Sequence, residues 1–137
     1  MRDRLAAAKT FVDPWDMKTG AGHMLDIELL LQTGRVLTPA VTSASPLGMI
    51  PGLVAAGWLE RSEGHLLADT LGCLMAVQQI TRLAVDGRYE PQSAGSGLAA
   101  LLAQVTGQRD IAALARSVAT ETELAAQIID RRLAADV

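Results

Sequence analysis

Residues 62–85 read SEGHLLADTLGCLMAVQQITRLAV, a stretch in which one apolar stripe recurs at helical spacing. The stripe consists of Leu67, Leu71, Leu74, Thr81 and Val85. These positions share one face of a helix that has 3.6 residues per turn. At 1.5 Å per residue the helix would be roughly 36 Å long, about the full length of a small bundle. The pattern predicts one long helix against which the rest of the chain packs.

Shorter helices are predicted on both sides of this stretch. Apolar residues crowd the range 24–37, and Ser45 is a suitable N-cap for a helix over 46–57 that ends at Gly57. A short apolar helix is expected over 98–105, and Asp110 can cap a final helix that reaches residue 134. No window alternates between apolar and polar residues for long enough to indicate a strand.

The fold class expected is therefore all-α, an up-and-down helical bundle of five to six helices. The 137 residues fit one domain. We expect three parts within it: 1–12, the end of a helix that continues from an absent upstream domain; 13–37, a turn and helix; and 45–137, the remaining bundle.

The composition indicates what the core is made of and argues against some classes of partner and compartment. Half of the residues are apolar but only 3% are aromatic, so the core must be aliphatic. A net charge of -3 offers no basic surface for nucleic acid, and no apolar run approaches the roughly 20 residues of a membrane helix. The lone Cys73 excludes an internal disulfide and fits a reducing compartment, so we expect a cytoplasmic protein.

Residues 13–32, DPWDMKTGAGHMLDIELLLQ, combine a glycine-spaced turn with a helix start. The turn could hold an anion at the helix N-terminus, with Lys18 adding a charge, although it lacks the ending of a P-loop. Alternatively, Gly22 or His23 caps the helix and Asp26 interacts with the positive end of the helix dipole. Asp26 and Glu28 are two residues apart and point to different sides, so they do not form a paired-carboxylate site.

The longer stretch DPWDMKTGAGHMLDIELLLQTGRVL resembles the signature D-x-K-x-G-x-G-G-x-x-D-I-E-[FL]-x-x-Q of the bifunctional glutamine synthetase adenylyltransferase/adenylyl-removing enzymes, in the form with Asp-Pro-Trp that is typical of alphaproteobacteria. The matching positions are Asp16, Lys18, Gly20, Gly22, Asp26, Ile27, Glu28 and Gln32. His23 replaces a second consecutive glycine of the signature. Residues 57–91 and 96–118 are similar to the same family more loosely, so the resemblance covers most of the chain.

The resemblance implies the C-terminal helical domain of such an enzyme. The transferase chemistry of the family lies in upstream nucleotidyltransferase domains, in which paired aspartates bind magnesium and ATP. This chain contains no Asp-x-Asp and should be inactive alone, binding no cofactor itself. The implied partners are the upstream nucleotidyltransferase domain, glutamine synthetase and the PII signal protein.

Two hypotheses follow for the role of the chain. In a larger enzyme, Lys18, Asp26 and Glu28 would lie at a domain junction, where Lys18 or Asp26 pairs across the interface, and Arg88 and Tyr89 would form a recognition loop. The alternative is a stand-alone helical interaction module. A domain of a larger enzyme should expose an apolar patch where its neighbour docks, whereas a stand-alone protein should bury that patch, for instance by dimerising.

Other chemistry-bearing residues are expected to be structural. His65 has no second metal ligand at helical spacing, so an exposed polar position is expected. Cys73 lies beside Leu74 in the long helix and is expected to be a small core residue. Residues 121–123 (ETE) and 130–132 (DRR) are expected on solvated faces of the last helix.

Overall fold

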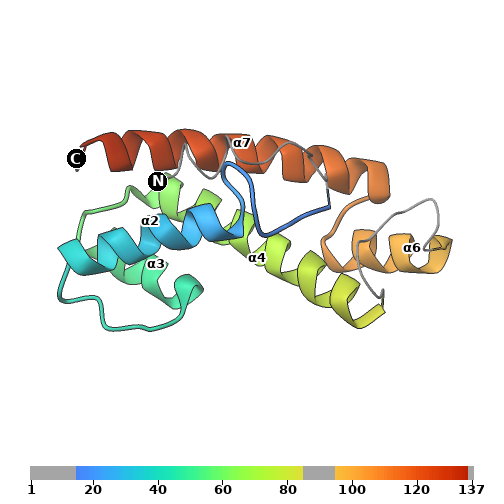
Figure 1. Ribbon diagram of the computed structural model, residues 1–137, viewed down its shortest axis with the longest axis horizontal. Coiled ribbons are helices and arrows are strands. Elements are labelled where there is room, and N and C mark those ends of the chain that lie inside the picture. The colour runs from blue at the N-terminus through green and yellow to red at the C-terminus, as the bar shows by residue number, and fades with distance from the viewer. Residues whose placement is uncertain (1–14, 85–94, 136–137) are drawn as a thin grey trace.

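The computed structural model describes residues 15–84 and 95–135, and the described part is entirely helical apart from its turns. Its five helices, with the labels of Figure 1, are α2 (Met24–Leu37), α3 (Pro46–Ala55), α4 (Arg61–Ala84), α6 (Ser96–Val105) and α7 (Ile111–Ala135). The all-α bundle is confirmed. The segment 2–9 and the residues Arg88 and Tyr89 lie outside the described ranges.

The long helix predicted from the apolar stripe is the centre of the bundle. α4 contacts each of the other four helices, and α7 crosses it along one side of the molecule (Figure 1). Leu67, Leu71 and Leu74 are fully buried, as their spacing predicts. The core around them is aliphatic, and its other completely buried large side chains are Ile27, Leu30, Leu31, Met49, Leu53, Leu59, Leu102, Leu114 and Ile129.

The predicted caps set the helix boundaries. The Ser45 hydroxyl accepts a hydrogen bond from the Gly48 amide (3.1 Å), and Pro46 occupies the first turn of α3. The Asp110 carboxylate accepts from the Ala113 amide (2.8 Å) at the start of α7. Gly57 has φ +82, so it ends the α3 region as expected.

The ends of α2 and α3 lie together. Gly34 in α2 has no side chain, and a Cβ atom there would lie 2.5 Å from the ring of Trp58, which follows α3. Trp58 therefore fills the space over Gly34 and fixes the two C-terminal ends at the same side of the bundle. The connection over residues 38–45 leads from the end of α2 to the start of α3 along the lower edge of the molecule in Figure 1.

Candidate functional site

The signature turn before α2 is tied to the helix by main-chain groups. The carbonyls of Met17 and Lys18 accept hydrogen bonds from the amides of Met24 (3.1 Å) and Leu25 (2.9 Å). These amides would otherwise be without partners at the helix start. An anion at this turn would need the same donors, so the geometry supports the helix-start interpretation over the anion site.

Asp26 strengthens the same helix start from inside. It is 8% exposed, and its Oδ2 atom accepts a hydrogen bond from the Gly22 amide at 2.8 Å. An acid at the third helical position that accepts from a main-chain amide before the helix resembles one half of a capping box, although the donor here is Gly22, one residue before the N-cap His23. The prediction of a buried, partnered Asp26 is confirmed, and its contacts give it a role within this domain.

Gly22 allows the turn to touch α7. Its φ is +76, and a Cβ atom there would lie 1.9 Å from the carbonyl oxygen of Thr122. Any side chain would therefore force the turn away from α7, in addition to the cost of a left-handed backbone. Gly20, with φ +122, also has a backbone conformation that favours glycine, but a Cβ atom there would approach only the ring of His23. Both signature glycines have structural reasons here.

His23 shows why the departure from the signature is tolerated. It is the N-cap residue of α2, with φ -85 and ψ -173, an extended conformation open to any residue. The position therefore does not require glycine in this chain. Its amide donates to the Gly20 carbonyl at 3.1 Å, which closes the turn through the main chain.

The other signature residues divide between the turn and the helix. Asp16 Oδ1 accepts from the amides of Lys18 (3.0 Å) and Thr19 (3.2 Å), so Asp16 shapes the turn. The side chain of Lys18 is exposed. Glu28 is half-buried and Gln32 is exposed, further along α2. The structure thus gathers Asp16, the glycines and Asp26 in one turn.

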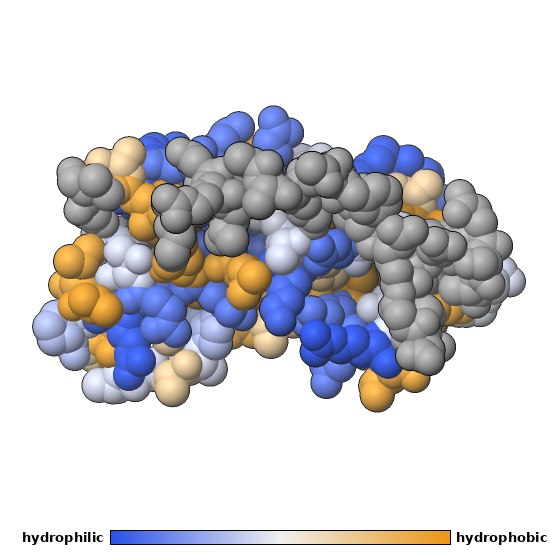
Figure 2. Space-filling view, viewed as in Figure 1, coloured by the Kyte–Doolittle hydropathy of each residue, from blue (hydrophilic) through white to orange (hydrophobic). Residues whose placement is uncertain are grey.

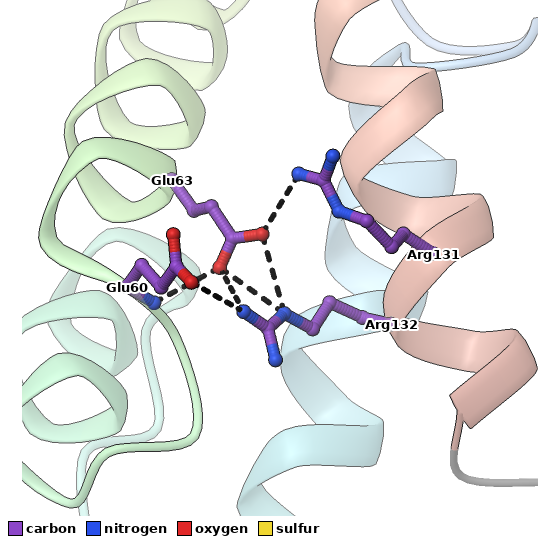
Figure 3. Close-up of polar contacts among 4 residues, drawn as sticks. All are labelled: Glu60, Glu63, Arg131 and Arg132. Carbon is purple, nitrogen blue, oxygen red and sulfur yellow. Dashed lines mark hydrogen bonds and ion pairs between the residues drawn. The ribbon is translucent and has the colours of Figure 1, made fainter.

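A second polar site, which the sequence analysis missed, joins the two longest helices. Glu63, in the first turn of α4, is only 4% exposed and lies opposite Arg131 and Arg132 near the end of α7 (Figure 3). Its Oε2 atom accepts from Arg131 Nη2 at 3.0 Å, and its Oε1 atom accepts from Arg132 Nε at 3.1 Å. Arg132 Nη2 also donates to Glu63 and lies 3.9 Å from the carboxylate of Glu60.

Glu63 also caps its own helix. Its Oε1 atom accepts a hydrogen bond from the Glu60 amide at 2.9 Å, so the carboxylate serves both α4 and α7. Burial alone would raise the pKa of Glu63, but the hydrogen bonds from Arg132, the Glu60 amide and Arg131 outweigh it and hold the pKa below its ordinary value. The group is therefore ionised at neutral pH and functions as an anchor between the helices.

The expectation that residues 130–132 are solvated holds for Asp130 and Arg131, which are exposed, and is wrong for Arg132. The side chain of Arg132 is only 27% exposed because it lies against Glu63, whereas that of Arg131 is 63% exposed. A capping box has Ser, Thr, Asp or Asn three residues before the acid. Glu60 occupies that position here, so no sequence signal marks the capping role of Glu63. The pairing with the arginines depends on how α4 and α7 are aligned. The sequence pattern within one helix does not show this alignment.

Burial also shifts the pKa of two further groups among the described residues, Glu121 and Cys73. Burial raises the pKa of Glu121, and the neighbouring Asp69 raises it further. Burial and the charge of Glu121 raise the pKa of the Cys73 thiol to about 11, so the thiol stays protonated at neutral pH. Cys73 is half-buried against the core and His65 is exposed, as expected.

Residues 15–84 and 95–135 contain no group of three or more side chains placed to hold a metal. None of the described helices is both long and apolar enough to cross a bilayer.

The described residues form an all-helical domain. Its two polar clusters, around Asp26 and Glu63, hold its own helices in place. The chain is 32% identical, over 99% of its length, to a bifunctional glutamine synthetase adenylyltransferase/adenylyl-removing enzyme of Rhodopseudomonas palustris. It is 30% identical over 90% of its length to one from Bradyrhizobium diazoefficiens, and 28% over 97% to one from Xanthobacter autotrophicus. The chain is thus homologous to a segment of the bifunctional glutamine synthetase adenylyltransferase/adenylyl-removing enzymes.

The similarity concerns a small part of these proteins. The chain spans 14% of the length of the Rhodopseudomonas protein and 13% of that of the Bradyrhizobium protein. No protein-family model and no solved structure matches the chain. The expected relationship is nevertheless confirmed across almost all of its residues.

Proposed function

We propose that this chain acts as the non-catalytic C-terminal helical domain of an enzyme that transfers AMP from ATP to glutamine synthetase and removes it. The observation that carries the proposal is the similarity over 99% of the chain to one segment of an enzyme with that name. The site geometry supports it. The signature residues Asp16, Gly20, Gly22 and Asp26 build a helix start rather than a reaction centre.

In this proposal the domain supports chemistry that takes place elsewhere in the protein. ATP and magnesium would be bound by an upstream nucleotidyltransferase domain, which supplies the paired aspartates that this sequence lacks. Regulation of nitrogen assimilation in the cytoplasm, with glutamine synthetase and PII as partners, follows from the same proposal. Lys18, whose side chain is exposed, remains the signature residue best placed to contact a neighbouring domain.

A domain exchange tests the proposal. The matching segment of the Rhodopseudomonas palustris enzyme is replaced by this chain, and a second version lacks the segment altogether. Transfer of labelled AMP from ATP to purified glutamine synthetase is then measured for both proteins and for this chain alone. We expect transfer by the exchanged protein, a much lower rate without the segment, and no transfer by the isolated chain.

Two results would overturn the proposal. Transfer by the isolated chain would contradict the non-catalytic role. An exchanged protein no more active than the version without the segment, although it remains folded by circular dichroism, would favour the stand-alone interaction module instead.

A further inference from the structure

One side of the molecule is built from a long segment without charge. No charged residue occurs between Arg35 and Glu60, although one residue in five of the whole chain is charged. The segment includes α3, every residue of which is apolar, glycine or proline. A helix that is apolar on all sides is normally buried on all sides.

α3 is covered only on part of its circumference. Its inner face, formed by Met49, Ile50 and Leu53, is buried against α2 and α4. Its outer stripe consists of Leu47, Pro51 and Ala55, which are exposed and follow each other at intervals of four residues. This outer stripe therefore presents apolar surface to solvent.

The C-terminal end of α2 exposes further apolar side chains. Val36 is 78% exposed and Leu37 is 53% exposed, and Figure 2 shows an apolar area over the C-terminal end of α2. The contact between Gly34 and Trp58 places this end beside the end of α3. We call Val36, Leu37, Leu47, Pro51 and Ala55 the uncharged face.

Other exposed apolar side chains lie in a different setting. α6 is also free of charged residues and exposes Leu101 and Val105, but the exposed polar residue Gln104 lies between them and the exposed charged residues Arg109 and Asp110 follow. Leu124 on α7 follows the exposed Glu123. The cores of protein interfaces are depleted of charged side chains, and the uncharged face lies on the longest segment of the chain without a charged residue, 36–59.

We propose that the uncharged face is the surface through which this domain docks onto the remainder of a longer adenylyltransferase chain. This inference rests on the proposed function. The occupant follows from the size of the relatives: the matched segment is 14% of the Rhodopseudomonas protein, so most of that protein is available to cover a face that the bundle leaves open. The signature turn is less suited, since α7 covers Gly22 and Asp26 is buried.

Cysteine labelling tests the docking surface. Leu47→Cys is compared with the matched control Leu124→Cys, because the two leucines are similarly exposed, 38% and 42%. Each variant is made in the 137-residue chain and in the exchanged Rhodopseudomonas protein, and maleimide labelling is followed at each site by mass spectrometry. Cys73, with a pKa of about 11, serves as a slowly reacting internal reference.

We expect Leu47→Cys to label about tenfold more slowly, or slower still, in the exchanged protein than in the isolated chain, because docking excludes solvent. Leu124→Cys should label at similar rates in both. Equal labelling of Leu47→Cys in a catalytically active exchanged protein would overturn the docking surface while leaving the proposed function intact. Slow labelling of Leu47→Cys in the isolated chain, together with a dimeric mass by sedimentation, would assign the face to a second copy instead and overturn the inference.

Discussion

At Gly22, both the backbone conformation and the packing against α7 exclude a side chain. Its positive φ alone would make a side chain costly, and the carbonyl oxygen of Thr122 occupies the place of a Cβ atom. The neighbouring His23 shows the opposite case, since its extended backbone accepts any side chain. Adjacent positions of one signature thus differ entirely in what they tolerate.

Gly22→Ala should therefore lower the free energy of unfolding by about 3 kcal/mol or more, because the clash with main-chain atoms of α7 adds to the backbone strain. Urea unfolding followed by circular dichroism measures this. Gly57→Ala is the matched control: φ there is +82, but a Cβ atom meets nothing within 4 Å. It should cost about 1 kcal/mol. Equal losses for the two variants would contradict the role of α7.

The polar anchor formed by Glu63, Arg131 and Arg132 joins the two longest helices, α4 and α7. Glu63 is buried, accepts from both arginines and caps α4, whereas Glu60 beside it is mostly exposed. Removing the charge of Glu63 leaves Arg132 partly buried without its main counter-ion.

Glu63→Gln should destabilise the protein by about 2 kcal/mol, in the range of hydrogen bonds to charged groups. Glu60→Gln should change stability by less than about 0.5 kcal/mol, as is usual for an exposed ion pair. Both are measured as shifts in the urea midpoint at neutral pH. A loss for Glu60→Gln as large as that for Glu63→Gln would show that the anchor is not centred on Glu63.

The anchor also predicts a pH dependence. Because folding lowers the pKa of Glu63 below its ordinary value of 4.5, its contribution is present above that pH and is lost as the pH falls through the folded pKa. The wild-type chain should lose more stability than Glu63→Gln between about pH 6 and about pH 3. Urea midpoints for both proteins over this range provide the comparison, and parallel profiles would refute the linkage.

Glu121 should act with the opposite sign. Burial and Asp69 raise its pKa, so its contribution is most favourable below the ordinary value of 4.5 and weakens as the pH rises through the folded pKa. Glu121→Gln should therefore stabilise the protein at neutral pH, by less than about 1 kcal/mol because the group is partly solvated. The stabilisation should disappear in acid. Thermal unfolding of the wild-type chain and of Glu121→Gln, at neutral pH and in acid, measures both effects. A variant that is not stabilised at neutral pH, or that is equally stabilised in acid, would contradict this prediction.

At the scale of the whole molecule, local signals predicted the elements well. The helix expected over 24–37 is α2 itself. The long helix expected over 62–85 is α4, which begins one residue earlier, at Arg61, because Glu63 accepts from the Glu60 amide; Val85 lies outside the described residues. α6 begins at Ser96 rather than at residue 98, because Gly95, with φ +88, is its N-cap residue. Periodicity and caps act within a few residues, so a single sequence reveals them.

Contacts between elements were not predictable in the same way. The pair formed by Glu63 and Arg132 and the contact of Gly22 with Thr122 depend on how distant helices align. The family resemblance identified the signature residues but not what they touch. The hypothesis that Lys18, Asp26 and Glu28 lie at a domain junction stays a prediction. The uncharged face, by contrast, can be defined only when the exposure of each residue of α2 and α3 is known.

The anchor has a consequence for how quickly the molecule opens. Glu63 is separated from Arg131 and Arg132 by 68 and 69 residues, so their contacts close a long loop and should form only after α4 and α7 have met. A contact absent from the folding transition state affects the rate of unfolding rather than that of folding. Glu63→Gln should therefore unfold about 30-fold faster for a loss of about 2 kcal/mol, with an almost unchanged refolding rate in stopped-flow experiments.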